Sequence, residues 1–533
     1  MSKPNFNIAI KKLLQFEHLP ILVLLVVSLV TGLIIAKDYG QSWDEPNIYR
    51  YGNYVLNAYQ YFFHPQSLPD YGTNPQAAPD SGGNNMSDLN FYGPSYFIVA
   101  TILSKIFLRL VPGWTIIIAW HFVNFITFQI GVVIFYFLAK RWMSSFAAFG
   151  AALLLSVQPL FWGHAFINPK DIPFAVFFLA SVYFGLNMMD SPSAPKSILV
   201  IWAGIILGAT TSFRITGPFA GVLVFLYGLS KSPRKAVLTT IPYFLIAVLT
   251  SYLAWPYLWK SPIHHFIDSI RYMSDFPYAH PVLFAGNLYS AAHLPWSYVP
   301  ILLCLQLTEP LLILLILGFG VSIWRFVKKG QREPALIFSL WFLLPTIAII
   351  LSGSALYDNA RQLFFLLPPL FILAGLALDE LLSRFNHAVV KALAIGLIIL
   401  ASIIPMIQLH PYEYIYYNSF IGGAKGAFRN FETDYWDTSF KDAAQYLNAN
   451  APYHSRVVVF DLPIHILDAY TRPDLQIYNN EKTHYANFPY AVLSTRLNLD
   501  ESSCPNGQVV ATISRDDVIL AVIKKLPAGT HCE

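Results

Sequence analysis

Two adjacent carboxylates, Asp44 and Glu45, follow the first long apolar stretch of the chain. Trp43 precedes them and Pro46 comes directly after, within the segment DYGQSWDEPNIYR at residues 38–50. Carboxylates near a bilayer are costly unless they are paired or used, so this pair predicts a functional site. The alternative is a solvated loop in which Asp44 caps the next helix and Pro46 lies in its first turn. The spacing alone does not separate the two interpretations.

Three further segments carry isolated charges on what the topology below predicts to be the same membrane face as Asp44. They read HAFINPKD, FRITG and YDNAR, and they supply Lys170, Asp171, Arg214 and Arg361. Taken singly, each residue is as well explained by a local ion pair or by an arginine that reaches the lipid headgroups. Their occurrence together on one face favours a functional interpretation.

Carboxylates and cations at one membrane face suit the transfer of a group from a phosphate to a hydroxyl. A single carboxylate can act as general base if it lies within hydrogen-bond reach of the acceptor. Lys170, Arg214 and Arg361 would hold the phosphate and stabilise its growing negative charge. A monophosphate leaving group needs no general acid, so one base suffices.

The composition shows what must position these residues. The chain has 533 residues, of which 55% are hydrophobic and only 12% charged, whereas a soluble domain carries about a quarter charged residues. This balance predicts a protein that spans a lipid membrane many times. The basic residues are dispersed, so the sequence does not indicate a nucleic-acid partner.

Topology follows from the positions of Lys and Arg between the apolar stretches, because basic residues collect in the cytoplasm. The basic clusters are Lys3/Lys11/Lys12, Lys140/Arg141, Lys231/Arg234/Lys235, Arg325/Lys328/Lys329/Arg332 and Arg384/Lys391. Placing all of them inside predicts about eleven spans, near residues 19–36, 115–139, 144–162, 173–188, 197–213, 217–230, 237–256, 309–327, 334–352, 362–382 and 388–408. The N-terminus is then cytoplasmic and residues 409–533 lie outside. The stretch at 217–230 is short for a straight crossing, so we expect it to be broken or re-entrant.

Two long loops are predicted on the external side, at about residues 37–114 and 257–308. In the first loop, apolar residues from Ile48 to Phe62 recur at helical spacing, which predicts an amphipathic helix in the interface. A second interfacial helix is predicted at 91–111. The second loop contains His264 and His265, but their spacing does not fit a clean metal site, and solvated polarity is the favoured explanation.

The C-terminal segment, residues 409–533, is predicted to be a small α/β domain outside the membrane. A helix begins near Phe440, with Thr438 or Ser439 as its cap. Strands are expected at residues 456–460, 508–513 and 518–523. Cys504 and Cys532 flank the last two strands, and an antiparallel hairpin would bring them within reach of a disulfide, although two free thiols are the alternative.

The charged segments, taken in order, resemble the GT-C glycosyltransferases, specifically family 39. That family includes the protein O-mannosyltransferases and is related to the aminoarabinose transferase of lipid A. The likeness runs through NPKDIPF, FRITG, YDNARQLFFLLPPL, HPYEYIYYNSFIGGAKGAF and FETDYWDTSF, and covers about residues 15–445. The ordered set is more specific than any one motif. The sequence is most similar to bacterial members that depend on a phospholipid carrier.

The resemblance implies an α-helical polytopic membrane protein of GT-C type, with residues 1–408 as the transmembrane domain. It implies a polyprenyl-phosphate-linked sugar donor, transfer on the extracytoplasmic face of a bacterial inner membrane, and inversion at the sugar. Asp44 would be the general base, supported by Glu45 and Asp171. A glycan, lipid or protein remains open as the acceptor, although no segment resembles the MIR-type domain of eukaryotic protein O-mannosyltransferases. No cofactor is indicated with certainty, and a divalent metal remains open.

Two rival interpretations come from other functional classes. In a transporter or flippase for a lipid-linked or anionic substrate, charges within the membrane would line a translocation path. No inverted repeat is evident, however, and the acids lie at one face rather than at mid-span. An inactive homologue acting as a binding subunit is the third interpretation, and the intact acidic pair counts against it.

Overall fold

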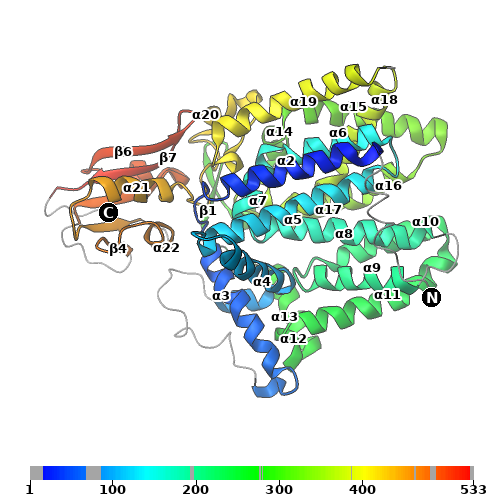
Figure 1. Cartoon of the computed structure of the whole chain (residues 1–533), viewed down its shortest axis with the longest axis horizontal. Helices are drawn as coiled ribbons and strands as arrows, with labels where there is room; N and C mark the ends of the chain where they lie inside the picture. The colour runs from blue at the N-terminus through cyan, green and yellow to red at the C-terminus, as the bar shows by residue number, and fades with distance from the viewer. Residues whose placement is uncertain are drawn as a thin grey trace.

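The computed structural model describes residues 16–67, 86–191, 197–274, 276, 278, 280–385, 387–460, 464–479 and 488–527. Lys3, Lys11 and Lys12 lie outside these ranges, and so does Cys532. A bundle of long helices is followed along the chain by a small sheet with its own helices, which lies beyond one end of the bundle (Figure 1). The predicted fold class, a polytopic helical protein with a small C-terminal α/β domain, is confirmed.

Six helices in the described part of the chain are long and apolar enough to cross a membrane. They are α5 (Ile116–Ala139), α8 (Asp171–Asp190), α11 (Pro233–Ala254), α15 (Glu309–Lys329), the run α16–η7–α17 (Glu333–Ile337, Phe338–Leu343 and Leu344–Ser352) and α19 (Ala388–Leu409). Shorter apolar helices lie at other predicted spans, namely α2 (Leu19–Ile35), α9 (Ser197–Thr211) and α10 (Pro218–Lys231). Helix α18 (Pro368–Leu382) lies at the predicted span 362–382. The count of eleven stays a prediction.

The third predicted span, 144–162, is broken into two helices. These are α6 (Ser145–Ser156) and α7 (Pro159–Ile167), and they are bent by 60° relative to one another. Proline disfavours the helical conformation in the residue before it, and Gln158 is accordingly extended, with ψ of 116°. Because α7 continues to Ile167, beyond the predicted end of the span, His164 lies in a helix rather than in the predicted turn.

The first of the two loops predicted to be external contains helices at both predicted positions, α3 (Glu45–Ala58) and α4 (Ser95–Leu110). Helix α3 buries Ile48, Tyr51 and Val55, the apolar side identified from the sequence. The two helices pack closely at Gly52, where a Cβ atom would lie 2.1 Å from Thr101 Oγ1. The second loop predicted to be external contains α12 (Tyr257–Lys260), α13 (Pro262–Ser274), the hairpin β1–β2 (Pro281–Phe284 and Asn287–Ser290) and α14 (Tyr298–Gln306).

The C-terminal domain contains a five-stranded sheet in the order β4-β3-β5-β7-β6. The strands are β3 (Arg456–Val459), β4 (Gln476–Asn479), β5 (Tyr490–Ser494), β6 (Gln508–Arg515) and β7 (Val518–Lys525). Strand β3 pairs in parallel with β4 and β5, and β7 pairs antiparallel with β5 and β6. The three predicted strands are confirmed, whereas β4 and β5 were not predicted.

Helix α21 (Phe440–Asn450) packs on this sheet through the apolar positions recognised in the sequence. Ser439 holds the N-cap position, one of the two that were predicted, but its side chain makes no capping hydrogen bond. Instead, the Asp434 carboxylate accepts the backbone N–H groups of Thr438 and Ser439, each at 3.2 Å. The helix start is therefore fixed by an acid five residues upstream of Ser439.

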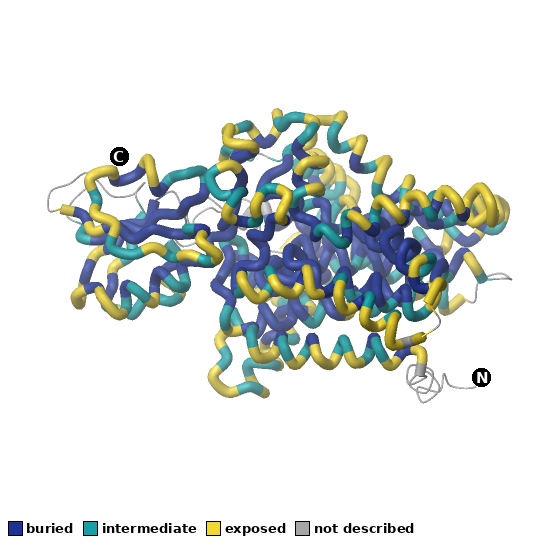
Figure 2. Tube along the Cα trace, turned by 90° about the horizontal axis from the view of Figure 1, so that it is seen from above, coloured by how far each residue is buried: buried dark blue, intermediate teal, exposed yellow. Residues whose placement is uncertain are grey.

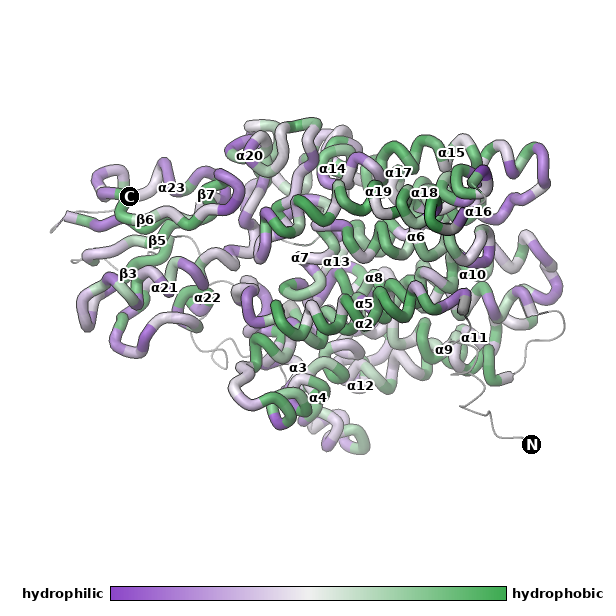
Figure 3. The backbone as a smooth tube through the Cα atoms, turned by 45° about the horizontal axis from the view of Figure 1, so that its top comes forward, coloured by the Kyte–Doolittle hydropathy of each residue, from purple (hydrophilic) through white to green (hydrophobic). Residues whose placement is uncertain are grey.

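Burial and hydropathy are distributed as a membrane protein requires. Buried residues fill the centre of the bundle (Figure 2), and hydrophobic positions run along the helices while hydrophilic ones collect at the chain's loops and in the C-terminal domain (Figure 3). Large apolar side chains remain exposed on the outer faces of α2, α11, α15 and α19, among them Val26, Leu245, Ile316 and Leu397. A surface this apolar is stable only if another apolar phase covers it, and lipid supplies that phase.

Candidate active site

Glu45 anchors the loop ahead of α3. Its carboxylate is fully buried and accepts hydrogen bonds from the backbone N–H of Ser42 at 2.6 Å and from the Tyr49 hydroxyl at 2.7 Å. His121 of α5 lies 3.0 Å away through its Nε2 atom. The Ser42 hydroxyl donates to the carbonyl of Ile167 at 2.8 Å, which ties the loop to the end of α7. Because both Glu45 oxygens are bonded and solvent does not reach them, this residue holds the loop in position.

Asp44 contacts Lys170 rather than capping its own helix. It occupies the N-cap position of α3, but its side chain makes no capping hydrogen bond. Its Oδ2 atom lies 2.6 Å from Lys170 Nζ. Burial disfavours the Lys170 ammonium, but Asp44 and Tyr92 together offset this cost and leave the pKa of Lys170 above its ordinary value. The capping alternative therefore does not explain why an acid stands here.

Asp171 is held by two arginines. Its Oδ1 lies 2.5 Å from Arg214 Nη2, and its Oδ2 lies 2.7 Å from Arg361 Nη1. Asn168 Nδ2 donates a third bond to Oδ2 at 2.8 Å, while Asn168 Oδ1 accepts the backbone N–H of Asp171. Asp171 is also the first residue of α8, where the helix dipole favours negative charge. These contacts leave the carboxylate fully occupied.

Aromatic rings connect the three cations. Lys170 Nζ lies 5.2 Å from the centre of the Tyr92 ring, and the Arg214 guanidinium lies 5.9 Å from the same ring. The Arg361 guanidinium lies 4.7 Å from the centre of the Trp436 ring. Cations over aromatic faces are stabilised by the ring quadrupole. Arg214 thus shares Tyr92 with Lys170 and shares a carboxylate with Arg361, so the cations form one cluster.

The C-terminal domain extends this cluster through Arg496. Its Nη2 atom donates to Asp358 Oδ1 at 2.5 Å and to the Tyr278 hydroxyl at 2.8 Å. The other Asp358 oxygen accepts from Arg361 Nη2 at 2.6 Å. Charges therefore alternate along a row, in the order Arg214, Asp171, Arg361, Asp358 and Arg496. The row runs from the helical bundle into the C-terminal domain.

Two pairs of residues with left-handed backbone lie beside the charged row. Asp358 and Asn359 have φ values of 55° and 61°, and Leu497 and Asn498, which follow Arg496, have values of 54° and 60°. Asp and Asn tolerate this left-handed conformation, but leucine adopts it at a cost. Such residues persist only where the surrounding contacts hold them, and they are common at functional sites.

Exposure distinguishes the carboxylates of the cluster. The Asp44 side chain is 19% exposed, whereas those of Glu45, Asp171 and Asp358 are 0%, 1% and 7% exposed. Among the residues that the structure describes, Asp44 forms an ion pair with Lys170 alone, while Asp171 and Asp358 each pair with two arginines. Asp44 is therefore the most accessible of these four carboxylates.

A second group of acids lies beside Arg496 in the C-terminal segment. Glu432 is buried, its Oε1 lies 3.6 Å from Arg496, and neither of its oxygens has a hydrogen-bond partner in the described part of the chain. Desolvation raises the pKa of Glu432 to about 7 and that of Asp437 to about 8. Ser494 donates to Asp437 at 2.7 Å. Burial therefore favours the protonated, uncharged form of both carboxyls.

The structure brings together the six residues selected from the sequence, which are Asp44, Glu45, Lys170, Asp171, Arg214 and Arg361. Sequence reasoning missed Tyr92, His121, Asp358 and Arg496. Of these four, Asp358 could have been found from the sequence, because it lies in the same YDNAR segment as Arg361. Arg496 lies in a part of the tail where no pattern pointed to the membrane domain.

No group of three or more His, Cys, Asp or Glu side chains is placed to hold a metal ion within the ranges that the model describes. His264, part of the histidine pair noted in the sequence, instead lies in α13 and forms an ion pair with Asp268 at 3.2 Å.

The fold and the site together define a polytopic membrane protein with a charged cluster between its helical bundle and an α/β domain. The fold is similar to that of ArnT from Cupriavidus metallidurans in its apo crystal structure, with a TM-score of 0.51 and 15% sequence identity over 94% of this chain and 97% of that one. The GT-C resemblance seen in the sequence is thus confirmed for the fold.

Two other solved structures are similar at lower scores. ArnT from the same organism bound to undecaprenyl phosphate gives a TM-score of 0.47 with 16% identity, covering 94% of this chain and 97% of that one. The arabinofuranosyltransferase AftD from Mycobacteria gives 0.46 with 10% identity, covering 95% of this chain and 40% of that one. No family model matches the sequence, and no curated protein matches it.

Proposed function

We propose that this protein is a membrane glycosyltransferase that moves a sugar from a polyprenyl-phosphate donor to an acceptor hydroxyl on the extracytoplasmic face. The observation that carries the proposal is the Asp44–Lys170 pair beside the Asp171–arginine cluster. A partly exposed carboxylate stands next to three cations, on a fold of GT-C type. These are the groups that deprotonation of a hydroxyl and departure of a phosphate require.

In the proposed reaction, Asp44 accepts the proton of the acceptor hydroxyl as its oxygen attacks the anomeric carbon. The bond between that carbon and the donor phosphate oxygen breaks, and polyprenyl phosphate leaves with the electron pair. Attack from the side opposite the phosphate inverts the configuration. The developing negative charge is stabilised by Lys170, Arg214 and Arg361.

The donor phosphate competes with the protein's own carboxylates for these cations. Within the described residues, Lys170 pairs with one carboxylate, that of Asp44. If Lys170 moved to an incoming phosphate, Asp44 would be free to act as the base. Arg214 and Arg361 remain oriented by Asp171, and Arg361 also by Asp358. Asp171 accordingly acts as a positioning residue, as does Glu45 through the loop it holds.

The acceptor is a glycan, lipid or protein that reaches the site between the bundle and the C-terminal domain. Trp43 and His465 lie at this junction, since His465 Nε2 is 3.1 Å from the Trp43 carbonyl. The proposed orientation places this junction outside the cytoplasm, in keeping with the basic clusters at the other end of the helices.

The test uses purified protein in lipid nanodiscs with polyprenyl-phosphate sugars carrying a radiolabelled sugar, together with membrane extracts as a source of acceptors. The expected result is a labelled product and an equal amount of released polyprenyl phosphate, both lost in Asp44→Asn. A transporter or flippase would move the intact donor across the bilayer without cleaving it. Donor that crosses uncleaved would contradict the proposal. Analysis of glycoconjugates from a deletion strain would then identify the missing sugar.

A further inference from the structure

A cavity lies at the end of the helical bundle that is opposite the Asp44 site. It has a volume of about 910 Å³, within the range of ligand pockets in general. Helix α5 begins near the site, where His121 meets Glu45, and ends just before Arg141 in the cavity wall. Its 24 residues span roughly 36 Å, which is comparable to the thickness of the hydrocarbon core. The cavity therefore opens at the membrane surface opposite Asp44.

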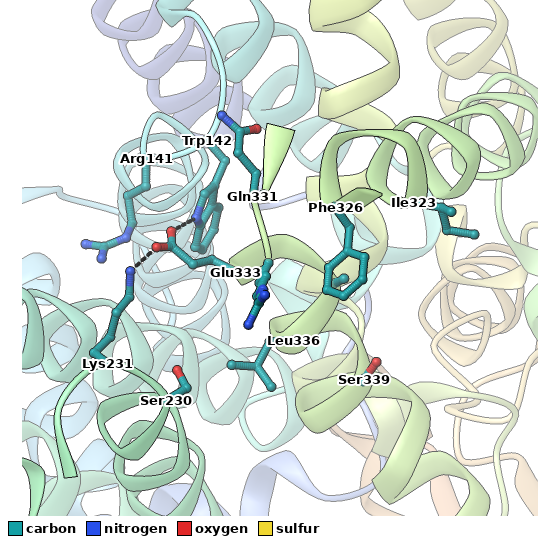
Figure 4. Close-up of a pocket in the computed structure, with 13 residues that line it drawn as sticks. Arg141, Trp142, Ser230, Lys231, Ile323, Phe326, Gln331, Glu333, Leu336 and Ser339 are labelled. Atoms are coloured by element: carbon teal, nitrogen blue, oxygen red, sulfur yellow. Dashed lines mark hydrogen bonds and ion pairs between the residues drawn. The ribbon is translucent and has the colours of Figure 1, made fainter. Parts of the chain in front are cut away.

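The walls of the cavity are part cationic and part apolar (Figure 4). Arg141, Lys231 and Arg332 supply positive charge, and Glu333 is the one acid among the described residues that line it. The Glu333 carboxylate is already engaged, because Lys231 and Trp142 Nε1 both bond to it. Figure 4 shows these two contacts on one side of the cavity, while Phe326 and Ile323 lie on the other.

Arg332 is the cation most available to a ligand. It lies in the exposed linker between α15 and α16, and it makes no ion pair with the described residues. Its guanidinium lies 6.0 Å from the centre of the Phe326 ring. Arg141 is held by Asn187 at 2.5 Å and by Asp190, but its buried Nε has no hydrogen-bond partner in the described part of the chain.

The apolar wall continues onto the surface that faces lipid. Ile323 and Phe326 are 49% and 45% exposed, and Phe319, on the same helix, is 49% exposed. A ligand for this cavity therefore needs an anionic group for the cations and hydrocarbon for α15. Basic pockets between membrane helices on the cytoplasmic side bind anionic lipid headgroups for this reason.

We infer that this cavity binds an anionic glycerophospholipid of the leaflet opposite the Asp44 site. The phosphate lies between Arg332 and Lys231, and the acyl chains run along Ile323 and Phe326. The inference does not depend on the proposed glycosyl transfer, because the two sites lie at opposite ends of α5.

The test compares the full-length protein with Lys231→Gln/Arg332→Gln in nanodiscs, with phosphatidylglycerol retention measured by native mass spectrometry. Loss of two cations should weaken phosphatidylglycerol binding by roughly 30-fold. The matched control, Lys328→Gln/Arg384→Gln, removes two exposed cations outside the cavity and should bind as the wild type does. Because Lys231 also pairs with Glu333, Arg332→Gln alone is measured too, and it should weaken binding by about 5-fold.

Three results would overturn the inference. The first is equal retention by the wild type and by both cavity variants. The second is equal retention of phosphatidylcholine, whose headgroup has no net charge. The third is displacement of the lipid by millimolar inorganic phosphate, which would identify a site for a free anion.

Discussion

Lys170 Nζ lies 2.6 Å from Asp44 Oδ2, and this contact joins a residue ahead of α8 to one ahead of α3. The contact occupies the carboxylate, so the pair must open or shift before Asp44 can act as the proposed base. A donor phosphate that attracts Lys170 would couple donor binding to the activation of Asp44.

The first prediction concerns Asp44 itself. Asp44→Asn should reduce transfer by at least ~10²-fold, the usual scale for a positioned base, while donor binding is largely retained. Turnover and donor binding are measured separately in nanodiscs. Asp38→Asn is the control, since Asp38 is a nearby carboxylate that contacts His410 instead of the cluster. Near-normal turnover in Asp44→Asn would remove this residue from the mechanism.

A second prediction separates Glu45 from Asp44. Glu45→Gln keeps the shape of the side chain and one acceptor oxygen, so the loop bond to Ser42 can survive. We expect about a tenfold loss in kcat with an unchanged pH profile, because Glu45 does not take the proton. A shifted pH profile in Glu45→Gln would show instead that Glu45 titrates in the reaction.

The helical part was predictable because hydropathy and basic clusters are strong signals over long segments. Single turns were harder to predict. Pro159 breaks the third span, yet Pro242 and Pro405 lie inside continuous helices. A proline leaves a backbone carbonyl without its helical hydrogen-bond partner. A helix can continue through the proline where neighbouring helices satisfy that carbonyl, and this depends on tertiary packing rather than on the local sequence.

The site was predictable only where charge stood out against an apolar background. Asp44, Lys170 and Arg214 stood out for that reason. Arg496 did not, because an arginine in a soluble domain is ordinary and its contact with Asp358 joins residues 138 positions apart. Strands β4 and β5 were missed for a related reason, since they are short and depend on the parallel partner β3 between them.

The third prediction tests whether the C-terminal domain orients the cation cluster. Arg496→Gln removes one arginine from Asp358, so Asp358 should shift towards Arg361 and misplace it. We expect about a tenfold rise in the donor KM with a smaller change in kcat, and partial rescue by Arg496→Lys. Arg429→Gln is the control, because Arg429 pairs with Asp500 within the C-terminal segment. Equal kinetics in Arg496→Gln and Arg429→Gln would contradict the positioning role.

The fourth prediction is the bridge between Cys504 and Cys532. Strands β6 and β7 form the antiparallel hairpin that the sequence indicated, and Cys504 precedes it. Closing this loop should stabilise the domain by roughly 3–4 kcal/mol in the chain-entropy model. Peptide mapping without reductant should recover the two cysteines in one linked peptide. Recovery of both as alkylated free thiols from non-reduced protein would exclude the bridge.

The last prediction is a pH dependence of stability that arises from Glu432. Desolvation raises its pKa in the folded protein to about 7, above the ordinary value of 4.5. The folded state therefore binds the proton more tightly than the unfolded chain does. Proton binding by Glu432 therefore adds to the free energy of unfolding. This added stability is complete below about pH 4.5 and is lost as the pH rises through 7.

Glu432→Gln mimics the protonated side chain, so the variant should not lose this stability as the pH rises. Thermal stability in detergent is measured at pH 5 and pH 8 by the recovery of monodisperse protein after heating. The wild type should lose more stability than Glu432→Gln between these pH values, by at most about 3 kcal/mol. Glu501→Gln is the control, because the Glu501 side chain is 67% exposed and should leave the wild-type dependence unchanged. If Glu432→Gln and Glu501→Gln show the same pH dependence, the buried carboxyl of Glu432 is not its source.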